Sequence, residues 1–130
     1  MIDNKKKPAV IEEGYAIAYS FYQAGKYVEA IQHFRHLLAL DLKQAKIWTG
    51  LGASLQMLQQ YQEAATAYAV AAFLNSANPQ PHIYAAECFF ALKDISQGLL
   101  TLEAAEKLTQ GKEEYAALNE RIQTMKKMWS

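Results

Sequence analysis

The chain has 130 residues, enough for one domain or one short repeat array, and 52% of them are hydrophobic, enough for a core. Thirteen basic residues balance thirteen acidic ones, which excludes a generally basic nucleic-acid-binding protein. The single cysteine excludes an intramolecular disulfide and a metal site built from cysteines alone.

The first eleven residues predict an irregular start, because three consecutive lysines lead into Pro8. No apolar stretch follows these lysines before Glu12, so we expect no secretory signal peptide. The longest uninterrupted apolar stretch, residues 67–74, is far shorter than the roughly 20 residues of a membrane-spanning helix. These features predict a cytoplasmic protein that binds neither membrane nor nucleic acid.

The sequence contains an internal repeat. Residues 15–30 align with residues 49–64 without gaps at an offset of 34, and a further 34 takes Gly52 to Ala86 and so begins a third copy. A period of 34 residues is that of the tetratricopeptide repeat, in which each copy is a pair of antiparallel helices. We expect the three repeats to span about 12–44, 45–78 and 79–110, within a repeat domain of 12–110.

Each repeat predicts two helices that cross where small residues let their backbones approach closely. The predicted helices are 12–24, 28–40, 45–58, 62–74, 79–92 and 96–108. The small residues expected at the crossings are Ala18 and Ala30, Gly52 and Ala64, and Ala86 and Gly98. The large apolar residues expected to fill the space beside them are Ile17, Phe21, Phe34, Leu51, Leu55, Tyr68, Phe89 and Leu102.

The last segment, residues 111–130, predicts a capping helix over about 113–129. Its apolar residues recur at spacings of 3 and 4, which gives one apolar stripe. The predicted fold class is therefore all-α: three tetratricopeptide-type helix pairs in a right-handed superhelix plus a C-terminal capping helix. The apolar residues of the stripe are Tyr115, Leu118, Ile122, Met125 and Trp129.

No group of residues predicts catalysis. Cys88 lies within an apolar stretch and is interpreted as a core thiol rather than a nucleophile beside a histidine. His33 and His36 stand three residues apart on a helix, but no acidic or cysteine partner at helical spacing completes a metal site. The glycines are scattered and form no phosphate-binding loop. We therefore expect no enzymatic activity, no cofactor and no bound metal.

A peptide-binding groove is predicted on the concave face, which the first helix of each repeat lines. Tyr15, Tyr19 and Tyr22 fall on one stripe at spacings of 4 and 3, and small Ala53 leaves room opposite them. Alternatively, some of these tyrosines pack against the N-terminal segment or the neighbouring repeat. The predicted peptide-binding residues are Tyr15, Tyr19, Tyr22, Thr49, Ala53, Gln56, Ile83, Tyr84, Glu87 and Phe90.

Three motifs resemble the class II chaperones of bacterial type III secretion: Tyr15-x3-Tyr19-x-Phe21-Tyr22, Gly-Leu-Gly-Ala at 50–53 and Ala-Ala-Glu-Cys at 85–88. The resemblance covers about residues 12–129. It implies a cytoplasmic chaperone that holds an extended N-terminal segment of a hydrophobic, pore-forming translocator in its groove before export, without ATP. It is compatible with a weak homodimer. Two alternatives remain: a chaperone of another secretion component, such as a needle subunit, and a generic scaffold that joins two proteins.

Overall fold

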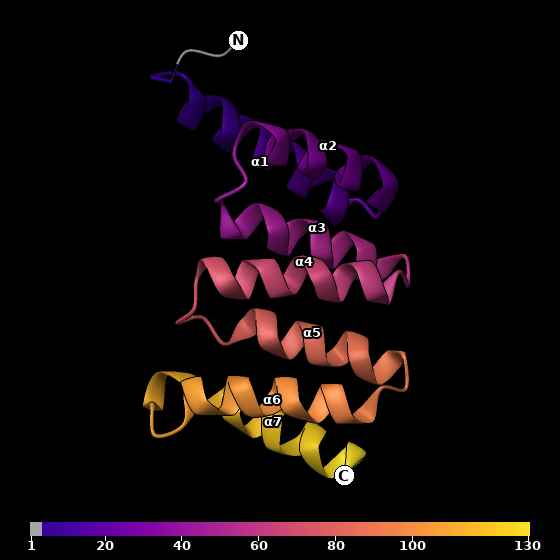
Figure 1. Cartoon of the computed structure of the whole chain (residues 1–130). Helices are drawn as coiled ribbons and strands as arrows, with labels where there is room; N and C mark the ends of the chain where they lie inside the picture. The colour runs from indigo at the N-terminus through magenta and orange to yellow at the C-terminus, as the bar shows by residue number, and fades with distance from the viewer. Residues whose placement is uncertain (1–3) are drawn as a thin grey trace.

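The computed structural model describes residues 4–130, and within that range every regular element is helical. Three antiparallel pairs follow one another, and a short 3₁₀ turn, η1 (Glu113–Tyr115), precedes a final helix (Figure 1). The predicted all-α class, with three helix pairs and a C-terminal helix, is confirmed. The helices are α1 (Lys7–Gln23), α2 (Tyr27–Leu40), α3 (Ala45–Met57), α4 (Tyr61–Leu74), α5 (Gln80–Ala91), α6 (Ile95–Thr109) and α7 (Ala116–Trp129).

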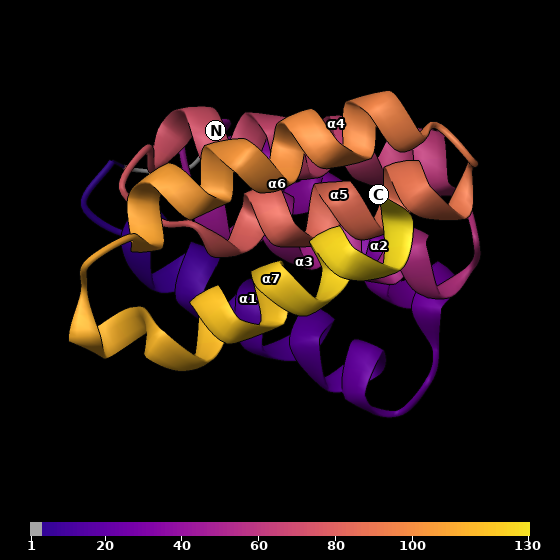
Figure 2. The ribbon, with the colours of Figure 1, turned by 90° about the horizontal axis from the view of Figure 1, so that it is seen from below.

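The helices stack in chain order, each packing on the one before it and the one after it. The N-terminal and C-terminal ends of the chain therefore lie at opposite ends of the stack (Figure 1). Seen along the stack, α4 and α6 lie on one side, while α1 and α7 lie on the other (Figure 2). The first helix and the last helix of the array thus lie on the same side of the stack.

The first helix begins at Lys7, five residues before the predicted start, so the expectation of an irregular segment over 1–11 is wrong for residues 7–11. Pro8 does not prevent this, because in the first helical turn its missing N–H leaves no hydrogen bond unmade. Ile11 is only 4% exposed and anchors the added turn to the core. Residues 1–3 of the predicted irregular segment lie outside the described residues.

The predicted crossings are tight. Every alanine expected there is fully buried, and the two glycines lie under aromatic rings. A Cβ on Gly52 would come within 2.8 Å of the Tyr68 ring, and one on Gly98 within 2.3 Å of the Phe90 ring. Ile17, expected in the core, is 49% exposed, because α1 ends the stack and no helix covers its outer side.

The turn inside each repeat contains one residue with positive φ: Gly25 at 77°, Gln59 at 61° and Lys93 at 65°. These positions are 34 residues apart, so the repeat preserves the left-handed residue that commonly follows a helix C-terminus. Only the first repeat uses glycine there, although glycine alone adopts this conformation without steric cost.

The C-terminal helix covers the third repeat as predicted from its apolar stripe. Ile122 is fully buried in a second core cluster with Ile83, Phe90 and Leu102. The Trp129 ring stacks on the Phe90 ring, with centroids 4.8 Å apart and planes at 1°. These contacts of its apolar face hold α7 in a fixed orientation, and so they also fix the position of its opposite, polar face.

Candidate functional site

A groove of about 410 Å³ opens between helices α1, α3, α4, α5 and α7. Eight of the ten predicted peptide-binding residues line it. These eight are Tyr15, Tyr19, Tyr22, Thr49, Ala53, Gln56, Tyr84 and Glu87. Four residues absent from the prediction also line it: Gly50, Met57, Tyr68 and Arg121.

One wall of the groove is the tyrosine stripe of α1. The ring centroids of Tyr15 and Tyr19 are 6.0 Å apart with planes at 13°, and those of Tyr19 and Tyr22 are 6.0 Å apart at 22°. Burial raises the pKa of Tyr15 and of Tyr22 above the usual value for tyrosine, so both hydroxyls keep their protons at neutral pH. The wall therefore offers flat apolar area together with hydrogen-bonding groups.

Tyr15 and Tyr22 also pack inward, against α2 of their own repeat rather than against the N-terminal segment or the neighbouring repeat that the alternative interpretation named. The Tyr15 ring lies 6.0 Å from that of Phe34, and the Tyr22 ring lies 5.6 Å from that of Tyr27. These contacts hold the rings from behind while one edge or face of each lines the groove. A wall held in this way loses little conformational entropy when a ligand covers it.

The floor of the groove belongs to α3 and is built from small residues. Gly50 has no room for a side chain, since a Cβ there would come within 2.4 Å of the Phe34 ring. Ala53 lies one turn further along, and Thr49 turns its hydroxyl to the Ala45 carbonyl oxygen, 3.0 Å away. The Thr49 hydroxyl therefore donates its proton within α3. The floor offers a ligand mainly room, not hydrogen-bond donors.

A chain of hydrogen bonds crosses the deeper part of the groove. The Tyr68 hydroxyl donates to Gln56 Oε1 at 2.7 Å, and Gln56 Nε2 donates to Glu87 Oε2 at 3.3 Å. Arg121 Nη2 of the capping helix donates to the other carboxylate oxygen of Glu87. Four helices are joined by this chain, which ends in an ion pair between α5 and α7.

Two predicted residues do not reach the groove. Ile83 and Phe90 are each 1% exposed and belong to the core beneath α7, so the prediction that they contact a peptide was wrong. The assignment assumed that groove positions of the third repeat stay open, but α7 packs there and Trp129 covers Phe90. Arg121 was missed because the capping helix was not counted among the repeats; its place 34 residues after Glu87 was the available signal.

The remaining candidate chemical groups lie elsewhere. Cys88 is fully buried, and burial raises the pKa of its thiol to about 12, so it holds its proton. His33 Nδ1 lies 2.9 Å from the carbonyl oxygen of Glu29. Within residues 4–130, no three histidine, cysteine, aspartate or glutamate side chains are placed to share a metal ion. In the same range, no helix combines the length and apolar character needed to cross a membrane.

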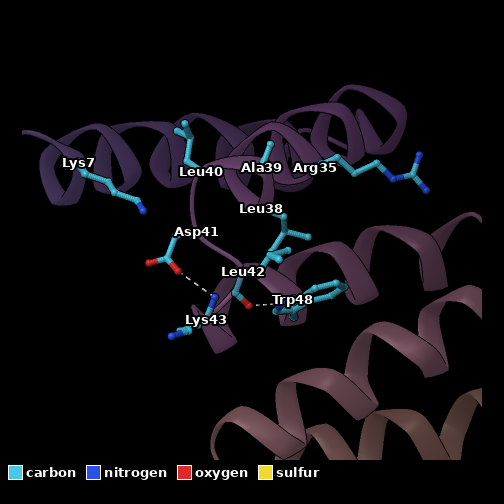
Figure 3. Close-up of a pocket in the computed structure, with 9 residues that line it drawn as sticks. All are labelled: Lys7, Arg35, Leu38, Ala39, Leu40, Asp41, Leu42, Lys43 and Trp48. Atoms are coloured by element: carbon cyan, nitrogen blue, oxygen red, sulfur yellow. Dashed lines mark hydrogen bonds between the residues drawn. The ribbon is translucent and has the colours of Figure 1, made fainter. Parts of the chain in front are cut away.

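A hollow of about 570 Å³ lies where α2 connects to α3, and Figure 3 shows its nine lining residues. None of them is a predicted site residue. Its polar groups are largely paired within the loop: Asp41 Oδ1 accepts from the Lys43 N–H at 2.9 Å, and Trp48 Nε1 donates to the Leu42 carbonyl at 2.8 Å. The hydrogen bond from the Lys43 N–H is the main cause that lowers the pKa of the Asp41 carboxyl. The hollow thus reflects the folding of a loop around its own polar groups.

The comparisons with known proteins agree with the fold. The tetratricopeptide-repeat family matches residues 11–43 and 46–78. The low calcium response locus protein H of Yersinia pestis is 30% identical over 122 residues, which cover 94% of this chain and 73% of the relative.

Two solved structures of similar proteins contain bound peptides. The Yersinia enterocolitica type III secretion chaperone SycD, in complex with a peptide of the translocator YopD, is 31% identical with a TM-score of 0.85; the match covers 90% of this chain and 89% of that one. PcrH, from Pseudomonas aeruginosa, in complex with the chaperone-binding region of PopD, is also 31% identical with a TM-score of 0.85, over 91% and 89% of the two chains. This chain therefore belongs to the tetratricopeptide-repeat chaperones of type III secretion.

Proposed function

We propose that this protein is a cytoplasmic chaperone that holds an extended segment of a type III secretion translocator in its concave groove. Holding this segment keeps the pore-forming client soluble and unassembled before export. The observation that carries the proposal is the tyrosine wall opposite a floor of small residues, a groove of about 410 Å³ in a chain whose relatives were solved with translocator peptides.

The shape of the groove favours an extended chain over a helix. Small Ala53 leaves space along the α3 floor, and an extended peptide can place one side chain in such a space while the next points away from it. Tyr19, which is 43% exposed, and Tyr84 on the far side flank this space. Aromatic anchors of this kind carry a large share of the affinity at protein interfaces.

Binding without catalysis is the corresponding proposal for the chemistry. A thiol with a pKa near 12 is a poor nucleophile at neutral pH, because only the thiolate reacts. Cys88 is also sealed from the groove by its burial. The groove itself contains tyrosines, an amide and one ion pair, which suit recognition of a chain rather than bond cleavage.

The test is co-expression with a candidate translocator, followed by titration of the purified chaperone with a peptide from that client. We expect the client to be soluble only with the chaperone. Tyr19→Ala and Tyr84→Ala should each weaken peptide binding about thirtyfold, the loss expected for truncating an anchor worth about 2 kcal/mol. Affinity should change little between low and high salt, since most of the contact is apolar.

The matched controls are His36→Ala and Glu103→Ala, which change exposed residues on the second helices of the first and third repeats. Both should bind normally, and all four variants should keep their helicity. Loss of binding in the controls together with normal binding in the tyrosine variants would place the client on the convex face. A small polymerising helical client in the co-purified complex would instead support a needle-subunit chaperone.

A further inference from the structure

The groove lining holds two charged side chains, Glu87 and Arg121, and they are paired with each other. The rest of the lining is tyrosine, amide, hydroxyl or apolar. Each member of the pair comes from a different element, α5 and α7, so the pair forms only when the capping helix is docked. With α7 docked, the two charges of the lining therefore neutralise each other at one contact.

The positions of both charges are fixed by their neighbours. Glu87 has one carboxylate oxygen on Arg121 and the other on Gln56, and Gln56 is held in turn by the Tyr68 hydroxyl. Arg121 precedes fully buried Ile122, which sets the face of α7 on which the guanidinium emerges. The two side chains are 28% and 50% exposed, so a ligand in the groove would remove water from both.

The pairing of Glu87 with Arg121 affects binding because a ligand removes water from both charges. A carboxylate covered by a ligand is strongly disfavoured unless a partner stays with it, and the same holds for a guanidinium. While Glu87 and Arg121 remain paired, a ligand residue above them meets two cancelling charges. A lysine there would compete with Arg121 for Glu87, and a glutamate would compete with Glu87 for Arg121.

We infer that the Glu87–Arg121 ion pair sets the charge selectivity of the groove. Paired, it admits uncharged client residues and disfavours both signs of charge; with one member removed, the other selects a client residue of opposite charge. This inference rests on the proposed function, because it concerns which segment of a translocator the groove accepts.

The experiment is a positional scan of one peptide, the chaperone-binding region of PopD. Each position is replaced in turn by alanine, lysine or glutamate, and every peptide is titrated against the wild type, Arg121→Gln, Glu87→Gln and the double variant. The quantity compared is the ratio of the dissociation constants of the glutamate and lysine peptides. Circular dichroism establishes that α7 stays folded in each variant.

At one or two adjacent peptide positions, Arg121→Gln should shift this ratio about tenfold in favour of lysine, as expected for a charge contact at a partly desolvated site. Glu87→Gln should shift it about tenfold toward glutamate at the same positions. The double variant should return the ratio close to the wild-type value. A merely structural effect of either substitution would weaken all peptides alike and would not reverse the preferred charge.

The control is Arg35→Gln, which removes a member of the Arg35–Glu63 ion pair on α2 and α4, outside the groove lining. Its charge ratio should equal that of the wild type. If the alanine peptides bind but the ratio is the same in all variants, the inference fails and the proposed function stands. If no peptide of the scan binds the wild-type chain, both fail.

Discussion

The second and third repeats reach the same close approach of two helices in opposite ways. In the second repeat the glycine is on the first helix, Gly52 of α3, and the ring above it comes from the second helix, Tyr68 of α4. In the third repeat the glycine is on the second helix, Gly98 of α6, and the ring comes from the first, Phe90 of α5. What the two repeats have in common is therefore the close approach of their two helices. The helix that carries the glycine differs between them.

The difference also explains why one ring reaches the groove and the other does not. The Tyr68 hydroxyl extends past the crossing to Gln56 and so joins the polar chain in the groove. Phe90 has no such group, and its outer face is covered by Trp129 of the capping helix. A repeat at the end of an array must close its own core, while an inner repeat can extend its crossing ring into the binding surface.

Among substitutions at the two crossings, we expect the largest loss of stability at Gly98. Gly98→Ala brings a Cβ within 2.3 Å of a ring that is itself held by Trp129, so we expect a loss of about 1–3 kcal/mol in the free energy of unfolding. Gly52→Ala should cost less, because its Cβ comes only within 2.8 Å of the ring. In both variants a gain in helix propensity of up to about 1 kcal/mol offsets part of the strain. Gly52→Leu should again cost about 1–3 kcal/mol.

Urea unfolding followed by circular dichroism measures these differences. The control is the double variant Gly98→Ala with Phe90→Leu, in which a smaller side chain makes room and part of the lost stability should return. Equal stability of the wild type and both alanine variants would contradict the placement of the crossings.

A smaller effect is expected at the turns, where the second and third repeats carry Gln59 and Lys93 at positive φ. The left-handed conformation costs a non-glycine residue about 1–2 kcal/mol, and glycine loses about 0.5–1 kcal/mol more chain entropy on folding. Lys93→Gly and Gln59→Gly should therefore each stabilise the fold by about 0.5 kcal/mol. Gly25→Ala in the first repeat should destabilise it by about 1 kcal/mol.

Melting temperatures of the three variants check this. Gln60→Gly is the matched control, because Gln60 has φ of −90° and so has no left-handed strain for glycine to relieve. A stabilisation by Gln60→Gly as large as that by Gln59→Gly would mean that the left-handed residue is not the source.

The smallest effect concerns the repeat position held by Trp48 in the second repeat and by His82 in the third. Burial lowers the pKa of His82, so the folded state takes up a proton less readily than the unfolded chain. Stability should therefore fall as the pH drops through the ordinary histidine value of about 6.5 toward the lower folded pKa. Trp48, which does not titrate, contributes no such slope.

The measurement is the melting temperature between pH 7.5 and pH 5, in wild type and in His82→Gln. The variant should lose less stability on acidification than the wild type. Gln80→Ala, at an exposed position of the same helix, serves as the control and should keep the wild-type slope. An identical slope in the wild type and His82→Gln would show that the burial of His82 does not matter for folding.

Periodicity accounts for what could be predicted from the sequence. A gapless offset of 34 located the helix pairs, and the position of Ala53 relative to Gly52 placed it in the groove rather than in the core. Such arguments work because each inner repeat meets the same neighbours as the next one. They fail where the neighbours change, as at Ile83 and Phe90, which α7 covers.

The features that the sequence did not predict lie in the first and the last helix of the array. The added turn at Lys7–Ile11 depends on burial of Ile11 against later helices, a long-range contact that composition does not reveal. Arg121 reaches Glu87 across 34 positions of the sequence, but from a helix that is not part of the repeat. Its role requires the docking of α7, which only the folded arrangement supplies.

The stacking of helices in chain order has a mechanical consequence. Four of the helices that line the groove, α1, α3, α5 and α7, are each separated from the next by an intervening helix, and α4 adds Tyr68 from between α3 and α5. In an array held by nearest-neighbour interfaces, either end can open without the other. A client segment lying along the groove would act as a tie between both ends, so that the loaded chaperone opens as one unit and the empty one frays from its termini.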